Sequence, residues 1–244
     1  MRFVSRILLY VIVFLVIPIV GGGLCFGQLS PGKAAPLFYL KDLQGKAYDL
    51  ATIKDQPMAI IYFFDVESRP SLECLLNIDE LSKQYKDADL LVWGITCSPR
   101  EKVAHFVTHT KPTFPVLLDD AGVSYLYQAR LILPTICILG PELKMLDFFQ
   151  GGGKTTEVML VRLAERKLQR KQTVIAKAIS EQVVKKNPKN VKAKTIKGYA
   201  ALKDGDLDAA EQTFHNLSKE GGKGEVLGKE GLSMVYAKKG QGEK

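Results

Sequence analysis

The chain has 244 residues, of which 46% are hydrophobic and 25% charged, and this balance excludes a disordered, collagen-like or disulfide-framework protein. The formal net charge is +8, and residues 162–244 alone hold 19 Lys and Arg against 10 Asp and Glu, so the basic excess lies in the C-terminal part. The four cysteines are scattered without a CxxC pair, so we predict neither a metal site nor a cofactor.

Residues 1–27 have the pattern of an export signal. Arg2 and Arg6 precede an apolar run over residues 7–26, and a positive start followed by apolar residues is typical of a signal peptide or an N-terminal membrane anchor. A spanning helix needs ~20 apolar residues, which this run barely supplies. Cleavage after Gly27 and a retained inner-membrane anchor therefore both stay open. Either one places the rest of the chain outside the cytoplasm, in the cell envelope or periplasm.

Residues 28–36 are expected to form an extended linker, and residues 37–170 an α/β domain. Its segments alternate as β-α-β-α-β-β-α, which predicts a central mixed sheet flanked by helices. Two parallel βαβ units lead into a hairpin and a closing helix, and Ser98 is expected to cap the second helix. The predicted strands are 46–50, 58–64, 90–96, 114–118, 135–139 and 143–149, and the predicted helices are 70–85, 98–109, 121–128 and 155–168.

Three motifs of this domain carry a resemblance to a family. Residues 32–45 (GKAAPLFYLKDLQG) match the opening Gly-x-x-Ala-Pro-x-Phe-x-Leu-x-Asp-x-x-Gly, and residues 114–119 (FPVLLD) match a later Phe-Pro-Val-Leu-x-Asp. Pro134 matches a proline that faces the active site. Residues 32–168 thus resemble the AhpC/TSA and TlpA/ResA-type thioredoxin-like envelope proteins. The resemblance implies a thioredoxin-like fold.

The resemblance also implies a redox site at the start of the first long helix, where the family carries Cys-x-Pro-Cys. This chain has Ser68, Arg69, Pro70 and Ser71 in those positions. A cysteine at a helix N-terminus becomes a reactive thiolate, whereas serine cannot form a disulfide. We therefore expect Ser68 and Ser71 to act as helix caps and the chain to lack ordinary thiol–disulfide exchange.

Two other cysteines leave an enzymatic alternative open. Cys74 lies one turn further along the same helix, and Cys97 follows strand 90–96 at the sheet edge where α/β sites form. A relocated Cys74–Cys97 pair would make the protein a thiol–disulfide oxidoreductase or a peroxide-reducing antioxidant protein. The alternative is that both are free, partly buried small hydrophobic residues.

The resemblance further implies that Pro134 is cis and that Leu133, Pro134 and Thr135 shape a groove for an extended substrate peptide. Peptide binding in this groove does not require redox chemistry. A purely structural proline remains the alternative.

Residues 171–244 show a weak repeat with a spacing of 34 that resembles the tetratricopeptide (TPR) pattern. Its helices are predicted at 172–186, 189–203, 206–219 and 225–239. The lysines alternate with apolar residues at helical spacing, so we expect a solvated helical surface and no nucleic-acid partner. A plain helical hairpin is the alternative. The residues that carry the pattern are Gly198, Ala201, Leu202, Gly205, Ala210 and Phe214.

The function expected from these features is a non-redox binding module. An exported thioredoxin-fold protein would hold a partner protein through its groove and its TPR-like tail, and would meet the membrane through a retained leader. The enzyme working through Cys74 and Cys97 is the alternative, and a structural spacer is a third reading.

Overall fold

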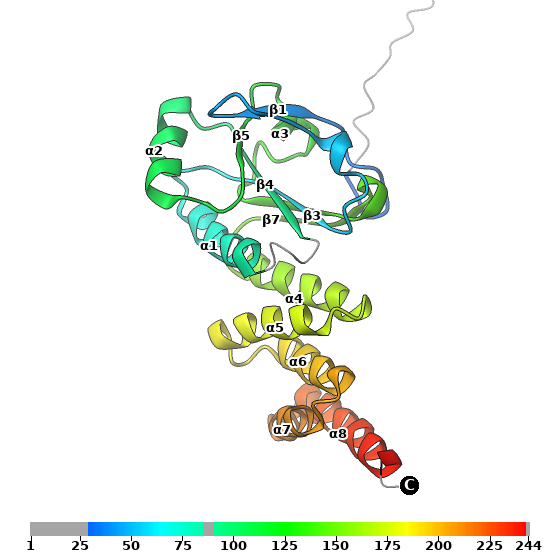
Figure 1. Ribbon diagram of the computed structural model, residues 1–244. Helices are drawn as coiled ribbons and strands as arrows, with labels where there is room; N and C mark the ends of the chain where they lie inside the picture. Colours follow the sequence, from blue (N-terminus) through cyan, green and yellow to red (C-terminus); the bar gives the residue numbers. More distant parts are fainter. Residues whose placement is uncertain (1–28, 85–89, 243–244) are drawn as a thin grey trace, which may run out of the picture.

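The computed structural model describes residues 29–84 and 90–242. The predicted leader and Cys25 lie outside the described residues. A sheet flanked by helices forms one end of the molecule, and a stack of helices continues from it (Figure 1). No helix in the described ranges is long and apolar enough to cross a membrane. The thioredoxin-like class with an all-helical C-terminal region, expected from the sequence, is confirmed.

The secondary-structure elements follow the predicted order. The strands are β1 (Tyr39–Asp42), β2 (Ala47–Asp49), β3 (Ala59–Phe63), β4 (Leu91–Thr96), β5 (Val116–Leu118), β6 (Thr135–Leu139) and β7 (Met145–Gln150). The α-helices are α1 (Arg69–Gln84), α2 (Arg100–Thr110), α3 (Val123–Leu126), α4 (Lys154–Gln169), α5 (Thr173–Lys186), α6 (Val191–Asp204), α7 (Leu207–Ser218) and α8 (Gly222–Gly242). Two short 3-10 helices span Leu50–Ile53 and Pro141–Leu143.

The seven strands form one mixed sheet in the order β2-β1-β5-β4-β3-β6-β7. Strands β3, β4 and β5 are parallel, and β6 and β7 add antiparallel strands beside β3. Strand β1 was not predicted. It pairs with β2 in a local hairpin and with β5 through Lys41 and Leu118. Only Leu40 of its four residues is buried, so its apolar alternation is too short to predict a strand.

The side chains of the central strands alternate between two buried layers, as expected of a strand that is covered on both faces. In β3, Ile60 and Tyr62 face the layer covered by α1, α2 and α4, which we call the helix side. Ala59, Ile61 and Phe63 face the opposite layer, which we call the loop side, where α3 and the N-terminal segment pack.

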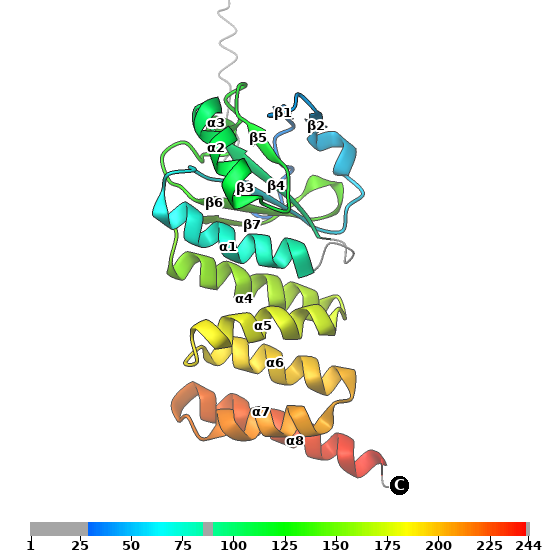
Figure 2. The same ribbon diagram turned by 60° about the vertical axis from the view of Figure 1, so that its left-hand side comes forward.

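Helix α4 belongs both to the sheet domain and to the tail. The buried cluster on the helix side continues from Ile60 through Met159 of α4 to Ile179 of α5 and Ala193 of α6. Figure 2 shows these helices stacked below the sheet, with successive helices running in alternate directions. The thioredoxin-like part and the start of the tail therefore share one hydrophobic core.

The far end of the tail has its own buried cluster around Phe214. A Cβ atom on Gly198 of α6 would lie 2.7 Å from the Phe214 ring, and one on Gly231 of α8 would lie 2.2 Å from it. Glycine at both positions lets the aromatic ring insert between the helices. Gly205, with φ of +85°, ends α6, and the Asp206 side chain accepts a hydrogen bond from the backbone of α7.

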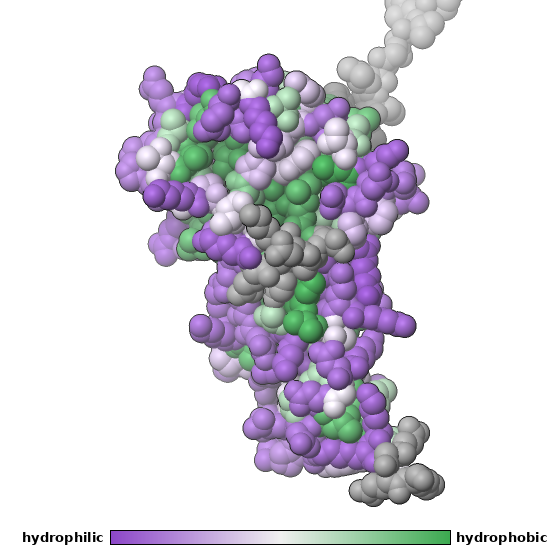
Figure 3. Space-filling model, viewed as in Figure 1, coloured by the Kyte–Doolittle hydropathy of each residue, from purple (hydrophilic) through white to green (hydrophobic). Residues whose placement is uncertain are grey.

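The surface of the two parts differs. On the face shown in Figure 3, hydrophobic residues gather on the thioredoxin-like part, and the tail is mostly hydrophilic with small hydrophobic areas. The exposed apolar side chains of the tail include Val174, Val226 and Met234.

Candidate functional site

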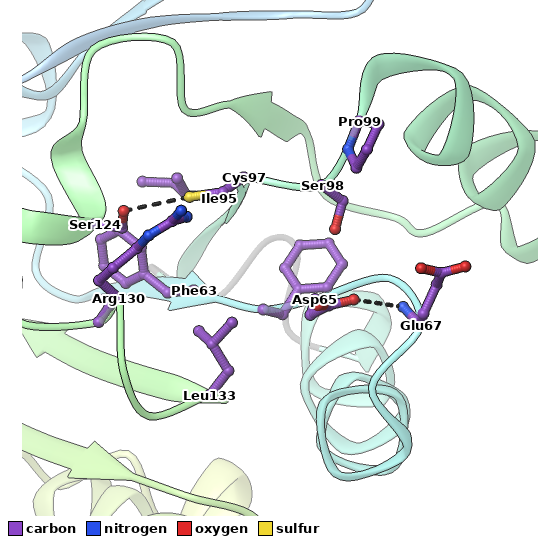
Figure 4. A pocket seen from close by; sticks show the side chains of 12 residues that line it. Phe63, Asp65, Glu67, Ile95, Cys97, Ser98, Pro99, Ser124, Arg130 and Leu133 are labelled. Atoms are coloured by element: carbon purple, nitrogen blue, oxygen red, sulfur yellow. Dashed lines mark hydrogen bonds between the residues drawn. The ribbon is translucent and has the colours of Figure 1, made fainter.

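A pocket of about 250 Å³ opens at the carboxyl ends of β3 and β4 (Figure 4). This is the edge of the sheet where α/β proteins build their sites. Phe63 of β3, Cys97 after β4 and Leu133 before the cis proline line it, with Asp65 and Arg130 at opposite sides. The pocket is therefore made by segments that are far apart in the sequence.

The serines at the start of α1 do not act in the same way. Ser68 precedes the helix, and its carbonyl accepts the first helical hydrogen bond, from Leu72 N at 2.9 Å. Ser71 is fully buried inside α1, where its hydroxyl accepts from Asp65 N at 3.3 Å and its carbonyl accepts from Tyr62 Oη at 2.5 Å. The prediction that Ser71 caps the helix is wrong, because α1 begins two residues earlier and the side chain reaches back to the preceding turn.

The residues between these serines face other parts of the protein. Arg69 is exposed and pairs with Glu73 on its own helix at 2.7 Å. Pro70 packs under the turn before α4, where a Cβ on Gly152 would lie 2.8 Å from the proline. The turn that starts α1 is thus held against the turn that starts α4.

Ser98 is also placed differently from the prediction. Helix α2 begins at Arg100 without a side-chain cap, so Ser98 is not its capping residue. Its hydroxyl instead accepts from Val66 N at 3.3 Å and from Thr96 Oγ1 at 3.0 Å. These bonds tie the end of β4 to the loop after β3 and fix the wall of the pocket.

Cys74 has the environment of a structural residue. It is buried on the helix side of the sheet, with 1% of its surface exposed. Burial raises the pKa of its thiol to about 11, because the thiolate would lose its hydration. The thiol is therefore protonated and inaccessible at neutral pH.

Cys97 is the cysteine that reaches the pocket. Its thiol donates to Asp119 Oδ2 at 3.3 Å and lies 3.3 Å from Ser124 Oγ. Burial and the Asp119 carboxylate raise the pKa of this thiol, while hydrogen bonding with Ser124 and Arg130 offsets part of the shift. A thiol held in its protonated form is a weak nucleophile.

The structure does not bring the two cysteines of the proposed redox pair together. Trp93 and Ile95 of β4 face the loop side, and Cys97 continues their alternation toward α3 on that side. Cys74 lies on the helix side, so the sheet separates the two thiols. Cys137 of β6 is fully buried, and burial raises its pKa as well. The three cysteines in the described part of the chain are free.

The segment before Pro134 forms an apolar rim beside the pocket. The Leu133–Pro134 bond is cis, as the resemblance implied, and Leu133 lines the pocket. Thr135 is buried at the start of β6, and its hydroxyl donates to the Ile132 carbonyl at 2.5 Å. We call the exposed residues Tyr125, Leu131 and Ile132 the cis-proline rim; their exposed fractions are 63%, 93% and 47%.

Sequence reasoning missed the rim and Arg130. The Arg130 guanidinium lies 5.5 Å from the centre of the Tyr125 ring and contacts the Cys97 thiol. An available signal was the run of three apolar residues immediately before the proline, in a segment without helical or strand periodicity. No group of three His, Cys, Asp or Glu side chains within residues 29–84 and 90–242 is arranged to hold a metal ion.

The comparisons with known proteins agree with this architecture. Residues 31–147 match the model of the AhpC/TSA family. This match spans most of the thioredoxin-like domain, which we call the AhpC/TSA domain after the family that it resembles. The chain is 26% identical over 155 residues to the thiol-disulfide oxidoreductase ResA of Bacillus cereus, which covers 60% of this chain and 89% of that protein. It is 28% identical over 99 residues to a chloroplastic peroxiredoxin Q of Oryza sativa, which covers 39% of this chain and 44% of that protein.

A solved structure shows the same fold for the AhpC/TSA domain. It is a candidate protein disulfide isomerase from Bacteroides thetaiotaomicron, with a TM-score of 0.50 and 22% sequence identity. The match covers 58% of this chain and 92% of that one. Thiol-disulfide oxidoreductases are thus among the relatives of this domain. A shared fold does not fix the chemistry, so the chemistry of this chain has to be argued from its own residues.

Proposed function

We propose that the protein is a non-redox member of this family, which binds an extended segment of a partner protein beside Pro134. The observation that carries the proposal is the pair Ser68 and Ser71 at the start of α1. The resemblance places the redox cysteines there, and the Ser71 hydroxyl is instead bound to the backbone of Asp65. Serines at both positions support a site without thiol–disulfide exchange.

The cis-proline rim supplies the binding surface. Leu131 and Ile132 expose apolar side chains beside a preformed pocket, and such a combination is typical of protein interaction sites. Arg130 adds a positive charge to the pocket, and Asp65 and Glu67 add negative charges on the other side, which would orient a bound segment. The TPR-like tail is the second part of the proposed interaction surface.

The proposal also places the domain outside the cytoplasm. Its support is the sequence of residues 1–27, with Arg2 and Arg6 before the apolar run. In the envelope, a binding module of this kind would serve the assembly or maturation of another protein.

A thiol assay tests the non-redox part. We expect the wild-type chain to reduce insulin no faster than its Cys97→Ser variant. The double variant Ser68→Cys/Ser71→Cys is the control that shows whether the scaffold supports exchange under the same conditions. Faster reduction by the wild type, lost in Cys97→Ser, would instead establish thiol–disulfide exchange through Cys97.

A crosslinking experiment tests the binding part. A photoreactive amino acid at Leu131 is expected to capture a partner protein in the native compartment. The Ile132→Asp substitution beside it should reduce the yield. The matched control is Val174→Asp, an exposed valine of α5 that lies away from the rim. Equal yields from the two variants would contradict binding at the rim.

Exchange through Cys97 is the second candidate function. The observation that favours it is the position of the Cys97 thiol in the pocket, next to Arg130. In this case the protein would act with one thiol, because Cys74 is buried on the other side of the sheet.

A further inference from the structure

We propose that the groove between α4, α6 and α8 is a docking site for an acidic, amphipathic segment of a partner protein. This site is separate from the pocket beside Pro134. The inference rests on the proposed function in one respect, which is that the partner is a protein.

The groove, which we call the tail groove, has a volume of about 460 Å³ and an apolar floor. Leu168 comes from α4, Val191 and Tyr199 from α6, and Leu227 from α8. The AhpC/TSA domain thus supplies one wall through its closing helix, and the tail supplies the other two. Since α4 and α6 belong to the same buried core, the groove is held open by packing that extends to the sheet.

The charged side chains of the groove are mainly basic. Lys192, Lys223 and Glu165 line it. Lys192 pairs with Glu165 at 2.7 Å, so these two charges compensate each other. Lys223 makes no hydrogen bond or ion pair with any residue in the described ranges. One uncompensated positive charge therefore stands over an apolar floor.

The position of these lysines is unfavourable for the helices that carry them. Lys192 and Lys223 lie in the first turns of α6 and α8, where the helix dipole disfavours a cation. Glu165 compensates Lys192, and Glu225 shares the first turn of α8 with Lys223. The three helices that line the groove run in the same direction, so their first turns lie along one edge of the stack (Figure 2). Lys223 is thus the groove lysine that the described residues leave without a counter-charge, and an acidic partner would supply one.

Charge complementarity thus selects the occupant of the tail groove. A segment with apolar side chains on one face would cover the floor, and carboxylates beside them would meet Lys223. Residues 162–244, which contain most of the groove, carry the basic excess of the whole chain. A second copy of this chain would bring another basic surface to the groove, which like charges oppose.

The test uses two synthetic fluorescent peptides of the same length. Both have leucines at helical spacing; one has glutamates at the remaining positions and the other has lysines. Fluorescence anisotropy with the full chain is expected to show binding of the glutamate peptide only. Binding should weaken as the salt concentration rises, because exposed charges are screened.

The deciding variant is Lys223→Glu, with Lys185→Glu as its matched control. Lys185 is an exposed lysine of α5 that does not line the groove. Lys223→Glu should raise the Kd of the glutamate peptide roughly threefold to tenfold, and Lys185→Glu should leave it unchanged. Glutamate is favoured in the first turn of a helix, so Lys223→Glu is expected to fold.

Three outcomes would overturn the inference. They are equal binding of the two peptides, an equal effect of the two variants, and self-association of the chain that Lys223→Glu abolishes. The result is separable from the proposed function. Peptide binding without capture at Leu131 would count against the rim alone, and capture without peptide binding would count against the tail groove alone.

Discussion

Replacing Phe214 by alanine should unfold the end of the tail and leave the AhpC/TSA domain folded. The ring is fully buried and packs edge-on against Tyr199, with centroids 5.1 Å apart. Gly198 and Gly231 leave the space that it fills. The cluster around it is distinct from the core that joins the sheet to α4, α5 and the first part of α6.

The magnitude follows from the buried area. An aromatic side chain of this kind buries roughly 200 Å² of apolar surface, which at about 25 cal/mol per Å² stabilises the fold by ~5 kcal/mol. Truncation of a buried phenylalanine to alanine costs about 3–5 kcal/mol. The Phe214 cluster has six buried apolar residues, so a loss of this size should exceed what α7 and α8 retain.

Hydrogen exchange measured by mass spectrometry checks this prediction. In Phe214→Ala, peptides from α7 and α8 should exchange rapidly, while those from β3, α1 and α4 keep their protection. The same variant should no longer bind the glutamate peptide at the tail groove, and it should still crosslink the partner protein through Leu131. Tyr236→Ala, which removes a half-exposed ring of α8, is the control and should change little. Loss of protection in β3 would refute the reasoning, since it would mean that the two clusters unfold as one unit.

Three further predictions concern packing, pH and thiol reactivity. Gly231→Ala should lower the free energy of unfolding by about 1–3 kcal/mol in denaturant unfolding, because the added Cβ would overlap the buried Phe214 ring between α7 and α8. In the control Gly240→Ala the added Cβ would meet no other atom, so this variant should not lower the stability. Burial opposes the ionisation of Asp79, but hydrogen bonds from a lysine and a threonine outweigh this effect and lower the pKa of its carboxyl group. The wild type should therefore be more stable than Asp79→Asn above about pH 4, and this difference should vanish as the pH falls through the folded-state pKa. Thermal unfolding as a function of pH measures the difference. Asp119→Asn removes a carboxylate that raises the pKa of Cys97, so iodoacetamide should alkylate this thiol faster in the variant at neutral pH, and an unchanged rate would contradict the assigned hydrogen bond.

Much of the fold could be predicted because its signals are local. The apolar runs around β3, β4 and β6 and the helical spacing of the tail place these elements within a few residues of their observed bounds. Strand β1 escaped prediction because only one of its four residues, Leu40, is buried, which leaves too short an apolar alternation. The bounds of α8 were also misjudged, since the helix was predicted over 225–239 and spans Gly222–Gly242.

The candidate site was predictable in its chemistry and not in its geometry. Ser68 and Ser71 are visible in the sequence as residues without thiol chemistry. The separation of Cys74 from Cys97 is not visible there, because it depends on which face of the sheet α1 covers. The exposure of Leu131 is equally hidden, since hydrophobic residues are expected to be buried until the packing around them is known.

By itself, the sequence determined the order of strands and helices except for β1, and the presence of Ser68 and Ser71, not cysteines, at the start of α1. These are properties of single residues and of local periodicity. Only the tertiary structure decided that α4 serves both the sheet and the tail, that Cys97 alone reaches the pocket among the described cysteines, and that Lys192 and Lys223 line one groove. The physical reason is that these features arise from contacts between segments far apart in the chain, and such contacts leave no periodic signal in the sequence.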